Sequence, residues 1–284
     1  MWRFFSIFYF SLAGLNAQES EIRVWNQMLD HPSPIVMRVF LRALELTEPE
    51  YGSFQLIRSR SMEQGRAIRA LEVGGLDIAV FAPDAKREQT LLSIPFPIEK
   101  GLLGWRVCLI RSDRIAPFYK ISSLSGWKKS GLTIGQLTTW PDTNVLRSNG
   151  LKLELTPIYE SLFKMLRKGR FDCFLRSVIE VEDEVKKHPD LIIEKNILFR
   201  YPLPLLYFVS PANPKLAERV QLGLSRVKAS GEYEKIFKES LKNNSVMSTI
   251  GKRRVIDIEN NDLSPILKRS LLESDFKYSF STRD

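Results

Sequence analysis

The sequence predicts an α/β protein built from two similar lobes with a cleft between them. Two stretches far apart in the chain, 68–81 and 162–175, share one pattern: an amphipathic helix, a glycine, an Asp and a short apolar run. Glycine adopts the left-handed conformation that ends many helices. The apolar runs are too short for buried helices and are typical of strands covered on both faces. Each stretch therefore reads as half of a β–α–β unit, and small molecules bind in clefts between such lobes.

The chain begins with a segment that is typical of an export signal. Its 284 residues allow one large domain or two medium ones. Between residues 2 and 15, Arg3 is the only charge, and the apolar run is shorter than a stable membrane span. We therefore expect a signal peptide over residues 1–17, cleaved after Ala17 or at a second candidate, Gly14, and an exported, soluble protein. The alternative is an N-terminal strand or an anchor helix.

The excess of basic residues does not form a pattern typical of nucleic-acid binding. The net charge is +9, and loss of Arg3 with the signal peptide (9 − 1) leaves +8. Lys and Arg are scattered along the chain, and the densest cluster is 252–254. A solvated basic surface is therefore favoured over a nucleic-acid partner.

Cysteine and histidine usage predicts neither a metal site nor a cofactor. Cys108 and Cys173 fall in predicted strands with no paired spacing. An oxidising compartment permits a disulfide, but the apolar neighbours of both residues favour two buried free thiols. His31 and His188 have no companion Cys or His at metal-ligand spacing.

The expected elements of the first lobe alternate between strands and helices. Ser33 followed by Pro34 is a capping residue with proline in the first turn, which favours a helix start. Residues 61–64 have capping-box spacing and favour a second helix start. In chain order we expect strand 22–25, a helix from 33 with Val36, Phe40 and Leu44 facing the core, strand 54–57, a helix from 61, strand 77–81 and a charged turn at 84–88.

A complete second α/β set lies between two long apolar strands, 101–110 and 201–209, which would cross between the lobes as a hinge. Between them we expect strand 132–136, a loop at 140–142, a short helix ended by Gly150, strand 151–155, the second repeat and strand 191–194. A long helix capped by Asn213 and a polar tail from 243, with a short helix opened by Ser264, complete the chain. The expected lobe boundaries are 18–107 plus 203–284 for lobe 1 and 108–202 for lobe 2.

Several motifs recur in the order and spacing of one known group of proteins. They are 75–79, Arg87, 93–97, 140–142, 159–163, 169–172 and 231–237. Together these residues resemble bacterial periplasmic solute-binding proteins of family 3, whose best-known members bind polar amino acids for ABC transporters. The resemblance covers most of the mature chain and is strongest to a branch of unknown ligand, which has a Trp-Pro-Asp loop and an Arg-Ser-x-x-Glu stretch in the second lobe. It implies a type 2 periplasmic-binding fold with two crossing hinge strands, a periplasmic location and a monomer.

The sequence departs from the amino-acid binders of that family at the expected cation site. Those proteins carry an Asp that pairs with the ligand ammonium, and Ser177 occupies its place here, beside Arg176. The turn before Arg87 is also shorter than usual and lacks a Thr. Because a buried ammonium needs a carboxylate partner, we expect standard α-amino acids to bind weakly unless Glu180 replaces the missing Asp. Anionic or neutral polar solutes are then expected to bind better.

Arg87 and Arg176 are the leading candidates for ligand contacts, because each follows an equivalent strand of its lobe. A guanidinium holds a carboxylate through two parallel hydrogen bonds. In the family, the Arg matching Arg87 binds the ligand carboxylate. The alternatives are surface pairing of Arg87 with Asp84 or Glu88, and an internal i,i+4 pair between Arg176 and Glu180.

The loop before the short helix of lobe 2 adds further candidates. Thr139 and Asp142 lie where a helix start presents unpaired N–H groups, and Trp140 could stack on a flat ligand. The alternatives are that Asp142 is only a helix cap and Trp140 a core residue. Trp25 is a further candidate for the pocket wall.

The predicted function is to bind a small polar, amino-acid-like or anionic solute by closing the two lobes around it. The protein would then present this solute to an ABC permease. One alternative is a periplasmic sensor that acts on a membrane receptor. Another is a dehydratase-like enzyme on the same fold. The sequence offers no Ser-His-Asp arrangement and no nucleophile elbow. We therefore expect no enzymatic activity.

Overall fold

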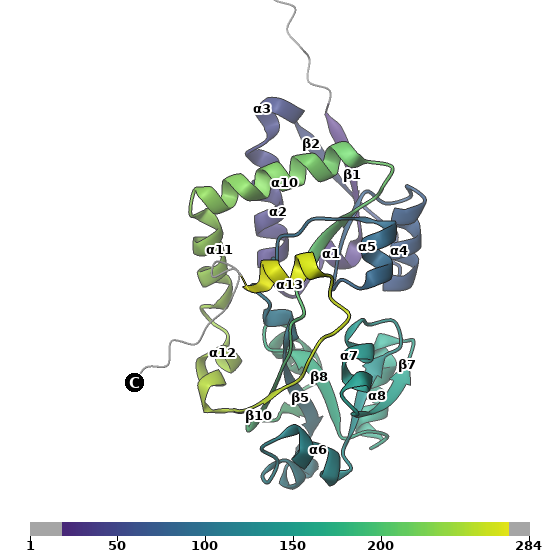
Figure 1. Ribbon diagram of the computed structural model, residues 1–284, viewed down its shortest axis with the longest axis vertical. Coiled ribbons are helices and arrows are strands. Elements are labelled where there is room, and N and C mark those ends of the chain that lie inside the picture. Colours follow the sequence, from purple (N-terminus) through teal and green to yellow (C-terminus); the bar gives the residue numbers. More distant parts are fainter. Residues whose placement is uncertain (1–18, 273–284) are drawn as a thin grey trace, which may run out of the picture.

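Two β-sheets, one above the other in Figure 1, organise the computed structural model, which describes residues 19–272. The expected signal peptide over residues 1–17 lies outside the described residues. Helices flank both sheets, so each sheet forms the centre of one lobe and the expected two-lobed α/β architecture is confirmed. In the described part of the chain no helix is long and apolar enough to cross a membrane.

The first lobe contains a mixed sheet in which β1 lies between β2 and β3, and β11 runs antiparallel to β3 and β4. Its strands, in spatial order, are β2 (Phe54–Arg58), β1 (Ser20–Val24), β3 (Ile78–Phe81), β11 (Leu206–Val209) and β4 (Leu92–Ser93). Its helices are α1 (Asn26–Leu29), α2 (Ile35–Glu45), α3 (Glu48–Tyr51), α4 (Gln64–Glu72), α5 (Ala85–Thr90), α10 (Pro214–Ala229) and α11 (Glu232–Leu241).

The second lobe contains a larger mixed sheet, in which β9 also pairs with β5. Its strands are β12 (Arg254–Asp257), β10 (Ile197–Arg200), β5 (Trp105–Arg111), β8 (Cys173–Ser177), β6 (Thr133–Leu137), β7 (Lys152–Thr156) and β9 (Leu191–Ile193). Its helices are α6 (Leu124–Ser130), α7 (Asp142–Ser148), α8 (Tyr159–Arg167) and α9 (Val181–Lys187), with short 3-10 turns at Leu102–Gly104, Ser112–Arg114 and Ala116–Phe118.

The repeated motif has the same structural role in both lobes. Each copy is a helix, α4 or α8, ended by a glycine with positive φ, Gly74 or Gly169, before a strand. Asp77 accepts a hydrogen bond from the Arg23 backbone N–H at 2.8 Å, and Asp172 accepts one from the Thr133 N–H at 3.0 Å. Each Asp therefore ties its strand to the neighbouring parallel strand, which explains why the pattern recurs in the sequence.

Less of the two crossing segments forms regular β-strand than the sequence predicts. The first crossing segment becomes a strand at Trp105, and of the expected strand 201–209 only β11 forms, because Pro202 and Pro204 cannot donate ladder hydrogen bonds. The two crossing segments touch at Gly104, where a Cβ atom would lie 1.9 Å from the carbonyl oxygen of Tyr201. A glycine is required there by the close approach of the two backbones.

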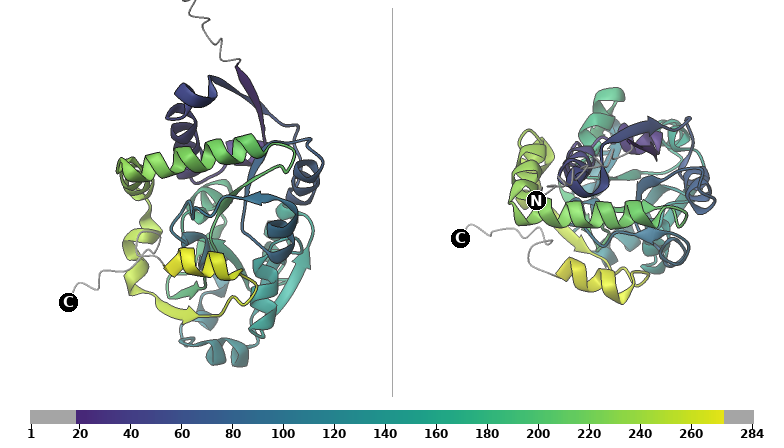
Figure 2. Two further views of the ribbon diagram at one scale, coloured as in Figure 1. Left: turned by 45° about the horizontal axis from the view of Figure 1, so that its top comes forward. Right: turned by 90° about the horizontal axis from the view of Figure 1, so that it is seen from above.

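The C-terminal segment does not stay in the first lobe, where the sequence analysis placed all of 203–284. After α11 the chain forms α12 (Ser245–Thr249), a 3-10 turn (Ile250–Lys252) and β12, which pairs in parallel with β10 of the second sheet. It then returns to the boundary between the lobes, where α13 (Pro265–Leu272) lies in yellow (Figures 1 and 2). The four-residue β12 was missed because it is short and lies in a polar tail. The remaining lobe boundaries stay a prediction.

The two cysteines form a disulfide, so the expectation of two free thiols is wrong. Cys108 on β5 and Cys173 on β8 are bonded, and both are buried. The two strands are antiparallel neighbours, with Cys108 opposite Leu175. Apolar neighbours indicated burial correctly, but burial does not distinguish a free thiol from a buried disulfide. The pairing of β5 with β8 brings the two cysteines together, and the spacing of the cysteines in the sequence does not predict this pairing.

Candidate functional site

The crossing segments determine which edges of the two sheets face each other. Leu206, at the crossing end of β11, pairs with Phe81, the last residue of β3. Arg106, at the crossing end of β5, pairs with Ser177, the last residue of β8. Side chains that follow β3 and β8 therefore lie at the boundary between the lobes, as ligand-binding groups do at strand carboxyl ends in α/β proteins.

Arg87 lies at this boundary and reaches the second lobe. Its side chain is buried and lies 5.4 Å over the Phe81 ring. Its guanidinium donates to the carbonyl oxygens of Ala82 (2.6 Å) and Thr139 (3.0 Å), and Nε lies 3.1 Å from the Asp84 carboxylate. Because Thr139 follows β6, the second of these hydrogen bonds joins the lobes. Burial lowers the pKa of Arg87, although Asp84 opposes the shift.

Arg176 is enclosed by carboxylates and aromatic rings of its own lobe. Its Nε donates to Glu184 at 2.7 Å, and its Nη2 donates to Glu180 at 3.1 Å. The guanidinium lies 4.8 Å over the ring of Trp140 and 5.4 Å over that of Tyr159. Burial acts to lower the pKa of Arg176, but Glu184, Tyr159 and Glu180 together raise it well above its usual value. The internal pair that the sequence left open is therefore formed.

His31 makes a second contact between the lobes. It lies between α1 and α2 of the first lobe, and its Nε2 is 3.7 Å from Oε1 of Glu180. Burial lowers the pKa of His31 despite this carboxylate. Burial also acts to raise the pKa of Glu180, but Arg176, His31 and Arg106 lower it overall. Glu180 is therefore an ionised carboxylate that faces a predominantly neutral imidazole at neutral pH.

Arg106 and Asp142 form a buried ion pair near the hinge. Nη2 of Arg106 lies 3.1 Å from Oδ2 of Asp142, and the Tyr201 hydroxyl donates to the same oxygen at 3.0 Å. Burial acts to lower the pKa of Arg106, but Tyr201, Asp142 and Glu180 raise it overall. Asp142 makes no side-chain hydrogen bond that caps α7, so the alternative that it is only a helix cap is wrong.

Glu99 is a buried carboxyl in the turn just before the first crossing segment, and it was not predicted from the sequence. Its exposure is 0%, and neither carboxylate oxygen has a hydrogen-bond partner among the described residues. Burial, and then the neighbouring Glu180, raise the pKa of Glu99 to about 8, whereas Ser33 and Arg106 act to lower it. No periodic pattern or motif singles out this position, so only the fold reveals it.

The other predicted residues differ in how far they are open to a ligand. The Ser177 hydroxyl is fully buried and donates to the Leu102 carbonyl at 3.1 Å, so it is committed to the hinge. Trp25 is buried beside Phe81 and donates its indole N–H to the Met62 carbonyl at 3.0 Å. Thr139 is exposed and Trp140 is half-buried. Their roles as ligand contacts stay predictions.

His31, Arg106, Tyr159, Glu184 and Tyr201 join this group without having been predicted as site residues. They come from different elements, and only the folded chain brings them together. We call the group formed by His31, Glu99, Arg106, Arg176 and Glu180 the interlobe cluster. Among residues 19–272, no group of three or more His, Cys, Asp or Glu side chains is placed to hold a metal ion.

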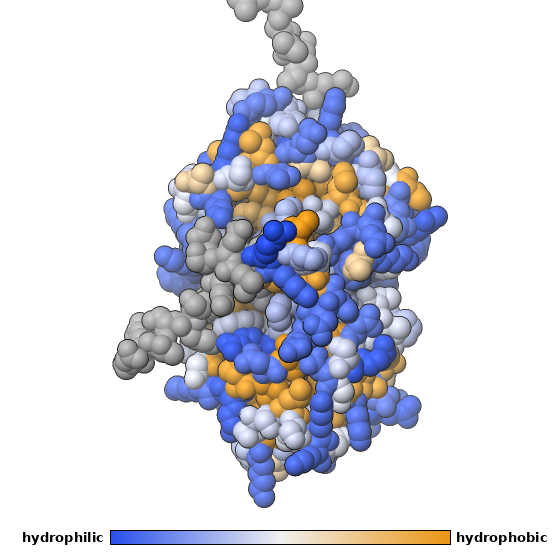
Figure 3. Space-filling view, in the orientation of Figure 1, coloured by the Kyte–Doolittle hydropathy of each residue, from blue (hydrophilic) through white to orange (hydrophobic). Residues whose placement is uncertain are grey.

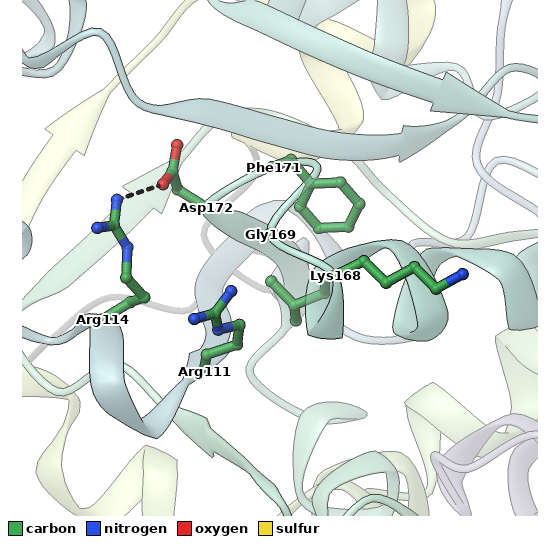
Figure 4. Close-up of a pocket in the computed structure, with 7 residues that line it drawn as sticks. Arg111, Arg114, Lys168, Gly169, Phe171 and Asp172 are labelled. Carbon is green, nitrogen blue, oxygen red and sulfur yellow. Dashed lines mark hydrogen bonds and ion pairs between the residues drawn. The ribbon is translucent and has the colours of Figure 1, made fainter.

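A hollow of about 350 Å³ lies elsewhere, at the far end of the second lobe (Figure 4). It is lined by Arg111 at the end of β5, by Arg114 in the 3-10 turn that follows, and by residues from the end of α8 to Asp172 before β8. The cations are partly neutralised, since Arg111 pairs with Asp113 and Arg114 pairs with Asp172 at 3.1 Å. Arg111 is at the end of β5 opposite to the hinge, so this hollow is separate from the interlobe cluster.

On the face drawn in Figure 3, the exposed hydrophobic side chains do not gather in one patch that would mark a binding surface for a partner. Hydrophilic side chains cover much of that face, and hydrophobic patches occur in both the upper and the lower lobe. The large hydrophobic side chains that are most exposed, Val73, Tyr119, Ile158 and Ile266, come from separate parts of the fold. Isolated exposed hydrophobic residues of this kind are common on soluble proteins.

No protein-family model and no curated protein matches the sequence. Solved structures do match. An ancestral arginine-binding protein bound to arginine is 17% identical, covers 78% of this chain and 98% of its own, and has a TM-score of 0.55. An arginine-specific periplasmic binding protein of Salmonella typhimurium is 14% identical over 78% of this chain and 98% of its own, with a TM-score of 0.56.

A third match is an amino-acid ABC transporter substrate-binding protein of Streptococcus pneumoniae bound to L-arginine. It is 14% identical over 79% of this chain and 94% of its own, with a TM-score of 0.56. The structural neighbours include several amino-acid ABC transporter substrate-binding proteins. At these identities the comparison establishes the fold: the chain has the two-lobed, type 2 periplasmic-binding architecture.

Proposed function

We propose that this chain is an exported solute-binding protein that closes its two lobes on a small polar solute. The observation that carries the proposal is the meeting of charged side chains from both lobes at one boundary. Arg87 donates to the Thr139 carbonyl at 3.0 Å, and His31 lies 3.7 Å from Glu180. Contacts that join two lobes on opposite sides of a hinge are the kind that lobe opening breaks and a solute can replace.

The comparisons support this class of function through names given to other proteins. Several neighbours are described as binding proteins for arginine or as amino-acid ABC transporter components, and another is linked to glutathione import in Streptococcus mutans. We propose accordingly that the solute is passed to an ABC permease. A membrane sensor that reads the closed form is the second candidate for the partner.

Binding is favoured over catalysis. One structural neighbour is an ancestral amino-acid-binding protein that is described as a precursor of cyclohexadienyl dehydratase, and it is itself named a binding protein. In the interlobe cluster, Glu180 is held by Arg176, and Arg106 is held by Asp142. These ion pairs favour fixed, complementary charges over a free nucleophile.

A periplasmic location is part of the proposal. It is supported by the expected signal peptide at 1–17 and by the disulfide between Cys108 and Cys173. Structural disulfides persist in oxidising compartments, including the bacterial periplasm, and are rare in the cytosol.

Calorimetry tests the proposal with a panel of amino acids, dicarboxylates and short peptides, titrated into the mature chain. We expect at least one compound to bind with a stoichiometry of one per chain. Arg87→Ala should lower the affinity for that compound, whereas Arg114→Ala, at the separate hollow of the second lobe, should leave the affinity unchanged. Absence of binding across the panel, or equal loss in both variants, contradicts a site between the lobes.

A further inference from the structure

Glu99 is the buried group that the contacts within the protein leave least satisfied. Its side chain is inaccessible to solvent and neither of its carboxylate oxygens has a hydrogen-bond partner in the described chain. The Ser33 hydroxyl is near enough to lower the pKa of Glu99 by hydrogen bonding, but it makes no well-formed hydrogen bond to either carboxylate oxygen. A buried polar group without a partner is costly, and such groups in folded proteins call for an explanation.

Glu99 is buried where charged groups of both lobes act on it. The groups that interact electrostatically with Glu99 are Ser33, Tyr207 and Tyr233 from the first lobe and Glu180 and Arg106 from the second. The Tyr207 and Tyr233 hydroxyls donate elsewhere, to the carbonyl of Val36 and to those of Pro97 and Ile98. They therefore do not satisfy Glu99.

Glu180 has spare acceptor capacity on the side that faces the first lobe. Its Oε2 accepts from Arg176 at 3.1 Å, but Oε1 lies 3.7 Å from His31, which is too far for a hydrogen bond. Within residues 19–272, three oxygens at the boundary therefore lack good donors: both from Glu99 and one from Glu180. The Nε of Arg106 is buried without a partner as well, but Asp142 and Tyr201 already partner this ion pair.

We propose that an N–H-bearing organic cation of the solute, an ammonium or a guanidinium, lies between Glu99 and Glu180 at the back of the cleft. This inference rests on the solute-binding function proposed above and adds the chemical class of the solute. The cation would donate to the free oxygens of Glu99 and would replace His31 beside Oε1 of Glu180. Paired, hydrogen-bonded charges are the form in which buried ions are tolerated.

The same arrangement couples binding to proton release. With a pKa of about 8, Glu99 carries a proton at pH 7 when no cation is present. A cation placed beside the carboxyl favours the ionised form and drives the proton off. Affinity should therefore rise with pH up to about 8, by at most about tenfold per pH unit, and level off above it. Arg106 and Arg176 stay charged throughout this range.

Titration calorimetry with six named probes tests the inference. L-arginine, L-glutamine, agmatine and putrescine carry an N–H cation, whereas succinate and glutarate do not. Each is titrated at pH 7 in buffers of different ionisation enthalpy, which reports the number of protons released. We expect at least one cationic probe to bind the wild-type protein with release of close to one proton, and succinate and glutarate to bind more weakly.

Glu99→Gln should lower the affinity for the cationic probe about tenfold or more and should abolish proton release on binding. Glu234→Gln is the matched control, because Glu234 is a half-buried carboxylate that pairs with Lys100, the neighbour of Glu99. The control should bind like the wild type. Thermal unfolding shows that both variants are folded, and Glu99→Gln should be at least as stable as the wild type at pH 7, since it removes a buried ionisable group.

Unchanged affinity in Glu99→Gln, or binding of a cationic probe without proton release, would overturn the inference. Tight binding of only succinate or glutarate would also overturn it, while leaving the solute-binding function intact. Binding of none of the six contradicts the cation site, whereas the function itself fails only if the wider panel fails too.

Discussion

Arg87 and Arg176 follow equivalent strands in the two lobes, yet their environments differ. Arg176 is neutralised within its own lobe by Glu180 and Glu184. Arg87 donates mainly to backbone carbonyls, and its one close carboxylate, Asp84, is partly exposed. More positive charge is therefore left at Arg87, and its hydrogen bond to Thr139 is one that opening of the lobes would free.

Replacement of Arg87 by Ala should weaken solute binding by roughly 2–5 kcal/mol, as expected when one partner of a buried charge pair is removed. Arg87→Lys should recover only part of the loss, because an ammonium cannot form two parallel hydrogen bonds to a carboxylate. Calorimetry with the solute that binds the wild-type protein measures both variants. Equal affinities for wild type and Arg87→Ala would exclude Arg87 from the site.

Glu99 should make the folded state less stable as the pH rises. Its pKa is raised from an ordinary 4.5 to about 8, so between these values the unfolded chain has lost a proton that the folded chain still holds. Stability contributed by this group is full below about pH 4.5, falls by up to about 1.4 kcal/mol per pH unit through that window, and levels off above pH 8.

Urea unfolding of wild type and Glu99→Gln at several pH values measures this effect. The difference in unfolding free energy between variant and wild type should grow in favour of the variant from pH 5 to pH 8. A difference that stays constant with pH would show that Glu99 titrates normally.

Single-residue chemistry was only partly predictable from the sequence. Arg87 could be placed at the boundary because it follows a strand of the repeated motif. Arg176 could be paired in two ways, and the sequence contained no information on the distance to Glu184 in the next helix. Glu99 was missed because a buried, unpartnered carboxyl is a property of the tertiary surroundings, and its neighbours in sequence are ordinary.

At the level of elements, the disulfide joins two neighbouring strands of the second sheet and closes a loop of 65 residues. In the chain-entropy model, a loop of this length restricts the unfolded chain by about 4 kcal/mol. Reduction should therefore lower the unfolding free energy by roughly 2–4 kcal/mol. Urea unfolding with and without reductant measures the change, and the double variant Cys108→Ala/Cys173→Ala should be insensitive to reductant. Identical curves for wild type under both conditions would contradict a structural disulfide.

Gly223 fixes the distance between α10 and α2. A Cβ at this position would lie 2.2 Å from the carbonyl oxygen of Ala43, a backbone atom that cannot move without shifting α2. Gly223→Ala should therefore destabilise the protein by about 1–3 kcal/mol, net of the roughly 1 kcal/mol that alanine normally gains over glycine in a helix.

Gly65→Ala in α4 is the matched control, because nothing lies within 4 Å of the Cβ that it would add. It should be neutral or slightly stabilising. Thermal unfolding compares the two variants, and equal shifts would show that close helix packing at Gly223 is not limiting.

Many elements of the fold could be predicted because their patterns are local, although short elements such as α6, α9 and β10 were not predicted and the expected charged turn at 84–88 is the helix α5. Apolar periodicity, caps such as Asn213 and the glycine-ended helices place the main strands and helices within a few residues. Two further features depend on the tertiary structure. The 201–205 stretch is apolar but has two prolines that exclude regular pairing, and β12 depends on an open edge of β10, which only the assembled sheet provides.

At the level of the whole molecule, polar contacts such as those of Arg87 with Thr139 and of His31 with Glu180 join the two lobes beside the hinge. Such contacts hold the lobes together less strongly than an apolar interface would, so their exchange for solute contacts can move the equilibrium between open and closed forms. The central claim is that a solute binds at this boundary and closes the lobes.

The most direct test is a distance measurement between the lobes. Spin labels on cysteines introduced at Val73 in the first lobe and Ile158 in the second are suitable because both residues are exposed, and the native cysteines are already bonded to each other. Pulsed electron resonance should give a broad distance distribution without solute. It should give a narrower, shorter one at a saturating concentration of a solute that binds by calorimetry. A distribution that does not change at saturation would contradict closure on the solute.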